Sequence, residues 1–62
     1  MKLNPKKAKK ALEKRLMTQM ELCKKAGLGF TTTNRALNGY EIHTTTAKKI
    51  CEALNVEPKD IM

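Results

Sequence analysis

The stretch that decides the fold is TQMELCKKAGLGFTTTNRALNG, residues 18–39. Thr18 and Glu21 have the spacing of a capping box, in which each side chain bonds the backbone N–H of the other residue at the start of a helix. The run Gly27-Leu28-Gly29 predicts that this helix ends in a tight turn. Asn38-Gly39 predicts the end of a second helix. The stretch therefore predicts two helices joined by a short glycine turn.

The spacing over about 18–38 favours a helix-turn-helix, with helices over about 18–25 and 30–37. Such a motif needs a small residue where the helices cross, a turn glycine that can take positive φ, and apolar residues flanking the turn. The residues that meet these needs are Cys23, Gly27, Leu22 and Leu28. A generic antiparallel helix pair in a small bundle would also fit, and the residues alone leave that alternative open.

The flanking sequence also predicts helices. Asn4-Pro5 is an N-cap followed by a first-turn proline, which indicates a helix over about 5–16. Its apolar positions are Ala8, Ala11, Leu12 and Leu16. A helix over about 44–54 places apolar residues at i, i+3, i+4 and i+7. These residues are Ala47, Ile50, Cys51 and Leu54.

The C-terminal residues continue this pattern. Asn55 is placed to end the helix in a left-handed conformation, and Pro58 to begin one short turn through Ile61. The sequence predicts an all-α fold, a compact bundle of four helices plus a short fifth, with residues 1–62 forming a single helix-turn-helix domain.

The charge of the chain is positive and unevenly distributed. The 62 residues contain 13 Lys and Arg against 6 Asp and Glu, a net charge of +7. Residues 1–17 hold seven cations and one acid, which leaves +6 there and +1 in residues 18–62. Such a basic segment can be a nucleic-acid arm, a membrane-surface helix or a solvated lysine face. We favour a solvated face that attracts a polyanion at long range, since the apolar side of this helix is mostly alanine.

Composition argues against several functional classes. Cys23 and Cys51 are 28 positions apart, which indicates two buried thiols in a reducing compartment rather than a disulfide scaffold or a metal site. His43, the single histidine, lacks a nearby nucleophile or acid partner, so we expect it at a helix end or on the surface. No apolar signal region follows Met1. We expect a cytoplasmic, non-enzymatic chain with no metal, cofactor, membrane contact or small-molecule ligand.

These residues resemble a known family. Thr18-Gln19-x-x-Leu22-Cys23-x-x-Ala26-Gly27-Leu28 is similar to the TQxxLAxxAGV signature of the lambda-repressor-like (Cro/repressor, XRE) DNA-binding domains. The likeness continues through Leu37-Asn38-Gly39 and through a segment from Thr46 to Ile61 similar to TxxKIAxALxVxPxxL. It implies a five-helix bacterial or phage DNA-binding domain, often a homodimer on a palindromic operator.

The chain departs from the family pattern at specific positions. Cys23 and Cys51 stand where alanine is usual, and glycine at position 29 replaces a Ser/Thr cap. Thr33 replaces an aliphatic residue inside the helix predicted over residues 30–37, which corresponds to the recognition helix of the family. Its hydroxyl needs a hydrogen-bond partner, and we predict that this partner is the carbonyl of Gly29 one turn earlier.

Helical geometry separates a core side of residues 30–37 from a side free to meet DNA. At about 100° per residue, Thr33, Ala36 and Leu37 share one side. The opposite side is predicted to contact bases, as the resemblance also implies, through Phe30, Thr31, Asn34 and Arg35. Asn34 can pair with adenine N6/N7, and Arg35 can bind guanine or a phosphate. Phe30 either contacts a thymine methyl or shields the joint between the helices, and Asn34 can also be merely a solvated residue.

Other residues are predicted to contact the DNA backbone, which positions a protein without specifying sequence. Gln19 is similar to the family glutamine that bridges a phosphate and the recognition helix. The further candidates are Thr32, Asn38, Gly39, Tyr40, Thr44 and Thr45. Thr32 can instead pack, and Tyr40 can equally be a half-buried loop aromatic.

The leading hypothesis is a sequence-specific regulator that binds double-stranded DNA, of the Cro or repressor type. The alternative is a protein-interaction module, such as an antitoxin or adaptor, that uses the same bundle to hold a partner chain.

Overall fold

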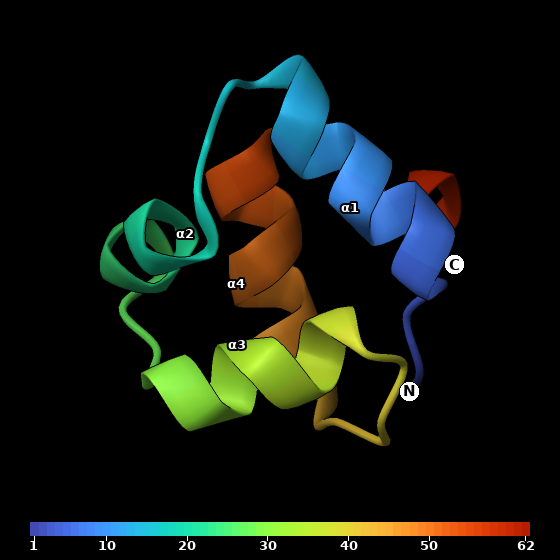
Figure 1. The fold of residues 1–62 in the computed structure, drawn as a ribbon. Helices are drawn as coiled ribbons and strands as arrows, with labels where there is room; N and C mark the ends of the chain where they lie inside the picture. Colours follow the sequence, from blue (N-terminus) through green and yellow to red (C-terminus); the bar gives the residue numbers. More distant parts are fainter.

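Four α-helices and one 3-10 turn follow one another in the computed structural model, which describes residues 1–62. The elements are α1 (Pro5–Lys14), α2 (Gln19–Ala26), α3 (Phe30–Leu37), α4 (Thr44–Leu54) and η1 (Pro58–Asp60). In Figure 1, α4 occupies the middle of the molecule, with α2, α3 and α1 arranged around it. α2 packs against both α3 and α4, and α1 packs against α3. The predicted all-α class is confirmed.

One cluster of small and aliphatic side chains forms the core. It contains Leu3, Ala8, Ala11, Leu12, Leu22, Ala36, Leu37, Ala47, Ile50, Cys51, Ala53, Leu54 and Ile61. Alanines let the short helices approach closely, while leucine and isoleucine fill the space between them. The apolar positions predicted for α4 are all buried, as are those predicted for α1 except Leu16. Ala26 and Leu28 pack against this core while remaining partly exposed.

The two predicted N-caps are confirmed. The side chain of Asn4 accepts hydrogen bonds from the backbone N–H groups of Lys6 and Lys7 at 3.1 and 3.2 Å. Thr18 and Glu21 form the complete capping box, with bonds of 3.2 and 3.1 Å. Because these side chains satisfy N–H groups that have no partner inside the helix, they define where α1 and α2 begin.

The four helices end in a similar way. After each of the four helices one residue has a positive φ: Leu16, Gly27, Gly39 and Asn55. At Asn55, as predicted, the turn closes with the Val56 N–H donating to the Cys51 carbonyl at 3.0 Å and the Asn55 N–H donating to Glu52 at 3.2 Å. This pair of bonds is the Schellman motif, which satisfies carbonyls that the helix leaves free.

The end of α1 corrects a prediction. The helix was expected to run to residue 16 with Leu16 on its packing side, but it ends at Lys14, and Leu16 has φ 51° and is 91% exposed. The Met17 N–H donates to the Leu12 carbonyl at 3.1 Å and the Leu16 N–H donates to Glu13 at 3.0 Å, so the Schellman turn forms here too. Periodicity alone extended the helix because leucine gives no signal of a left-handed residue.

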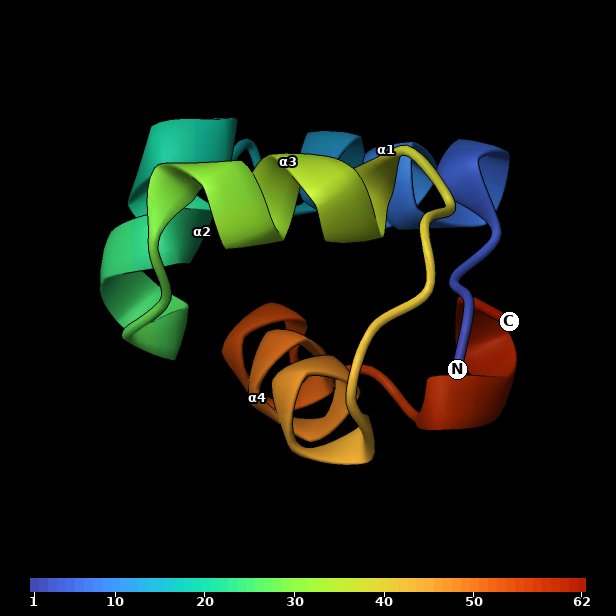
Figure 2. The same cartoon turned by 90° about the horizontal axis from the view of Figure 1, so that it is seen from below.

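The N-terminal segment is held by contacts that no local pattern predicted. Leu3 is buried in the core, and the Asn4 N–H donates to the Ile61 carbonyl at 2.7 Å. The Met1 carbonyl accepts from the Ile42 N–H at 2.8 Å. Figure 2 shows this segment running beside the loop between α3 and α4 and near the C-terminus. Leu3 and Ala8 occupy the positions of a hydrophobic staple around the Asn4 cap, which is the one local signal that could have placed Leu3 in the core.

Both cysteines are buried as free thiols, as predicted. Burial raises the pKa of the Cys51 thiol, and the carboxylates of Glu57, Asp60 and Glu52 raise it further.

None of the helices is both long and apolar enough to cross a membrane. No group of three or more His, Cys, Asp and Glu side chains is placed to hold a metal ion.

Candidate nucleic-acid interface

The joint between α2 and α3 has the geometry that a helix-turn-helix needs. Gly27 adopts the left-handed conformation, with φ 70° and ψ 31°, and its N–H donates to the Cys23 carbonyl. The Leu28 N–H donates to the same carbonyl at 3.0 Å. Cys23 and Leu22 are buried beneath the turn. A Cβ on Gly27 would meet nothing within 4 Å, so glycine is needed here for its φ and not for space.

α3 divides into two sides, as helical geometry predicted. Thr33, Ala36 and Leu37 are buried against the rest of the protein. The exposed side holds Phe30, Thr31, Thr32, Asn34 and Arg35. Phe30 is 54% exposed at the first position of the helix, so about half of its surface is free to contact another molecule.

The buried hydroxyl of Thr33 has the partner that was predicted for it. It donates to the Gly29 carbonyl at 3.1 Å, and the same carbonyl accepts the Thr33 N–H at 3.1 Å. A fully buried hydroxyl without such a partner would be costly. This bond attaches the first turn of α3 to the glycine that precedes it.

Asn34 lies at the centre of a small network of amides on the exposed side. Its Oδ1 accepts from Gln19 Nε2 at 3.3 Å and from Asn38 Nδ2 at 3.3 Å. Gln19 is the first residue of α2, and Asn38 caps the end of α3. The contact between Gln19 and α3 was expected from the family resemblance. The contact with Asn38 was not predicted, although its i, i+4 spacing was a usable signal.

Arg35 is placed over the ring of Tyr40. Its guanidinium carbon lies 5.6 Å from the ring centroid, within the range of a cation–π contact. The Tyr40 N–H donates to the Arg35 carbonyl at 3.0 Å, which completes the turn after α3. Tyr40 is 55% exposed and therefore free on one side.

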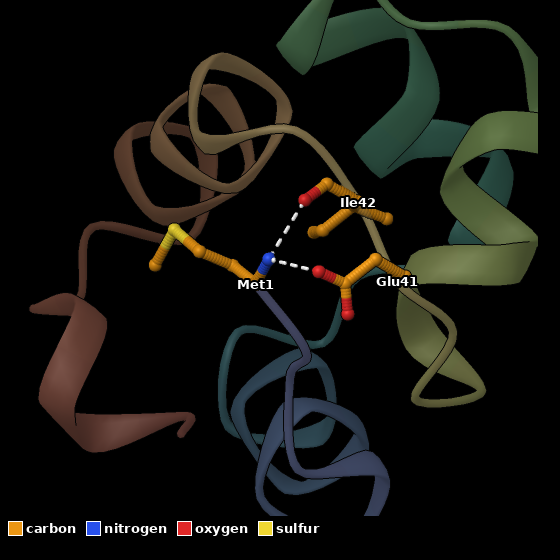
Figure 3. A network of polar contacts seen from close by, with 3 residues as sticks. All are labelled: Met1, Glu41 and Ile42. Atoms are coloured by element: carbon orange, nitrogen blue, oxygen red, sulfur yellow. Dashed lines mark hydrogen bonds and ion pairs between the residues drawn. The ribbon is translucent and has the colours of Figure 1, made fainter.

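The loop between α3 and α4 is tied to the N-terminus. The Met1 ammonium donates to Glu41 Oε1 and to the Ile42 carbonyl, each at 3.0 Å (Figure 3). The hydrogen bond and charge of this ammonium hold the pKa of the Glu41 carboxyl below its ordinary value of 4.5. Gly39 lies in the same loop with φ 82°, and a Cβ there would lie 2.9 Å from the ring of Pro5. The conformation of the loop is therefore set by both its own turn and the start of the chain.

Thr44 and Thr45 are exposed in the first turn of α4. His43 precedes them as an exposed N-cap whose side chain makes no capping bond, and the first turn contains no acidic residue. The first N–H groups of a helix lack partners inside it, and the helix dipole there favours an anion. This helix start can therefore face a phosphate without repelling it.

The Lys and Arg side chains form no ion pairs with carboxylates. The single ion pair joins the Met1 ammonium to Glu41, so none of the Lys and Arg side chains is paired. Lys6, Lys9 and their neighbours extend from α1, whereas Arg35 is the one cation on α3. The positive charge is thus concentrated on α1 and not on the exposed side of α3.

Comparison with known proteins agrees with this architecture. The sequence model of the Cro/C1-type helix-turn-helix DNA-binding domain matches residues 8–62. The chain belongs to this family, and its fold and general function are therefore those of a DNA-binding domain used in transcription regulation.

Solved structures with the same fold include parts of enzymes. A hydroxyethylphosphonate dioxygenase mutant superposes with a TM-score of 0.85 at 27% identity, over 100% of this chain and 14% of that one. PhpD containing cadmium matches with a TM-score of 0.83 at 27% identity, over 100% of this chain and 13% of that one. The likeness thus concerns a small helical part of those enzymes. No curated protein matches the chain significantly.

Proposed function

We propose that this chain regulates transcription by inserting α3 into the major groove of double-stranded DNA and choosing its site by sequence. The observation that carries the proposal is the exposed side of α3, whose side chains are left out of the core while the joint at Gly27 fixes the angle of the helix. An eight-residue helix is roughly 12 Å long, and the major groove is about 12 Å wide.

The proposed base-contacting residues are Phe30, Thr31, Asn34 and Arg35. Phe30 offers an apolar edge suited to a thymine methyl, and Thr31 a hydroxyl and a methyl. Arg35 can leave the Tyr40 ring to bind guanine or phosphate, since that contact is exposed and therefore weak. The proposed backbone contacts are Gln19, Thr32, Asn38, Gly39, Tyr40, Thr44 and Thr45.

The proposal also covers the domain organisation, the cellular location, the type of regulator and the number of copies that bind DNA. The 62 residues act as one domain, in the cytoplasm of a bacterial or phage-infected cell, as a repressor of the Cro type. Two copies bind a palindromic operator, because the interface described here is small and a second half-site multiplies the contacts. The unpaired lysines of α1 add affinity that does not depend on sequence.

Selection of duplexes from a random pool, followed by anisotropy titrations over a salt series, tests the proposal. We expect a selected motif, and a Kd that rises steeply with salt for selected and random duplexes alike. Arg35→Ala and Lys9→Ala form a matched pair, since each removes one positive charge. Arg35→Ala should change the selected motif or its advantage over random DNA, and Lys9→Ala should weaken both duplexes equally. Equal affinity for selected and random duplexes at every salt concentration would refute sequence-specific binding.

A second candidate is a protein-interaction module that uses the same bundle to hold a partner chain. The observation in its favour is that a fold of this kind also forms 13–14% of larger enzyme chains. Stoichiometric co-purification of another protein, together with no selected duplex, would favour this candidate over the first.

A further inference from the structure

The carbonyl oxygen of Asn34 has no acceptor capacity left. An amide oxygen has two lone pairs, and this one already accepts two hydrogen bonds, from Gln19 Nε2 and from Asn38 Nδ2, both at 3.3 Å. The donors come from two sides, one from the start of α2 and one from the next turn along α3. The amide of Asn34 is therefore held in one orientation, with its Nδ2 group as the part that remains free.

An asparagine held in this way presents donors only. Pairing with adenine requires its oxygen to accept the N6 hydrogen while its nitrogen donates to N7. Cytosine exposes only the N4 donor at this edge, so it would face a second donor. Guanine exposes two acceptors, O6 and N7, and thymine exposes the single acceptor O4. The free Nδ2 group thus matches guanine best, because guanine offers two acceptors, whereas thymine O4 and adenine N7 offer one each.

We propose that Gln19 and Asn38 are positioning residues that turn Asn34 into a hydrogen-bond donor, so that it prefers guanine to adenine at its base pair. This inference rests on the proposed insertion of α3 into the major groove. It replaces the adenine preference that the residue type alone suggested, because an isolated asparagine offers both a donor and an acceptor.

The test compares the base preferences of variants at one position of the selected motif. Asn34→Ala identifies that position, because the preference there should relax by on the order of tenfold while the rest of the motif stays. The wild-type protein should prefer guanine at this position. The double variant Gln19→Ala/Asn38→Ala frees Oδ1, so adenine should rise to match or exceed guanine there.

Base preference separates this role from simple loss of affinity. Gln19 and Asn38 are also proposed to contact phosphates, so the double variant will bind all duplexes more weakly. Thr44→Ala is the matched control, since it removes a proposed phosphate contact without touching Asn34, and it should weaken binding with the guanine preference intact. Circular dichroism of each variant confirms its helical fold, and the substituted side chains lie outside the core.

The outcomes are distinct. Guanine in the wild type and a shift toward adenine in the double variant would support the proposal. Adenine in the wild type, an unchanged guanine preference in the double variant, or no position that responds to Asn34→Ala would overturn it while leaving a selected motif in place. The absence of any selected motif for the wild type would instead refute the proposed function.

Discussion

Leu16→Gly should stabilise this protein. Leu16 is the left-handed residue that ends α1, with φ 51°, and its side chain is 91% exposed. Glycine adopts this conformation without the clash between Cβ and the backbone that a leucine suffers. The substitution therefore removes strain while giving up almost no packing.

The size of the effect follows from two opposing terms. An L-residue in the left-handed region costs roughly 1–2 kcal/mol, and the extra freedom of glycine in the unfolded chain costs about 0.5–1 kcal/mol. The midpoints of these two ranges differ by about 0.75 kcal/mol, so the free energy of unfolding should rise by about that amount, between limits of about 0 and 1.5 kcal/mol. In a domain of this size each 1 kcal/mol shifts Tm by about 4–8 °C, so a gain of about 0.75 kcal/mol should raise Tm by about 3–6 °C. The neighbouring Met17, which packs against the core, is not affected.

Thermal and urea unfolding followed by circular dichroism measure this effect. Two further substitutions at the same site serve as controls. Leu16→Ala removes most of the side chain but keeps Cβ, so its stability should stay within about 0.5 kcal/mol of the wild type. Leu16→Asn should fall between alanine and glycine, since asparagine tolerates the left-handed region better than other residues with a side chain. The urea m-value should not change if only the folded turn is relieved.

The reasoning would be refuted if Leu16→Gly were no more stable than Leu16→Ala, because the strain at Cβ would then not exceed the entropic cost of glycine. If Leu16→Ala lowered the free energy of unfolding by more than about 1 kcal/mol, the leucine side chain would instead be packed, as the helical periodicity suggested.

Three further results are expected. Gly39→Ala should destabilise the protein more than Gly27→Ala in urea unfolding, because both have positive φ but only at position 39 would Cβ meet the Pro5 ring, at 2.9 Å; equal losses would contradict this. The Glu41 carboxyl should titrate below 4.5 by NMR, and because folding lowers its pKa, its stabilising contact is present above the unfolded-state pKa and is lost as the pH falls through the folded one. A value at or above 4.5 would exclude the ammonium contact. Cys51 should react slowly with iodoacetamide at neutral pH until the protein is unfolded, since burial raises its pKa, and fast labelling of the native protein would show that the thiol is accessible.

Local signals in the sequence were enough to predict most of the helices. The caps at Asn4 and Thr18, the glycine at position 27 and the terminator Asn55 each act within one turn of chain, so their effects can be derived from neighbouring residues. The division of α3 into buried and exposed sides was predictable for the same reason, since helical geometry fixes which residues share a side.

The tertiary structure decided what depends on residues far apart in the chain. The contact of Met1 with Glu41 and Ile42 spans about forty residues and has no local pattern. The hydrogen bond from Gln19 to Asn34 depends on the angle at which α2 and α3 cross. The sequence alone therefore could not show that the Asn34 oxygen already accepts a hydrogen bond. Only the folded chain shows that Leu16 leaves the helix. The Met1 and Gln19 contacts join groups far apart in the chain, which no pattern of neighbouring residues describes, and the end of α1 could not be predicted because leucine gives no signal of a left-handed residue.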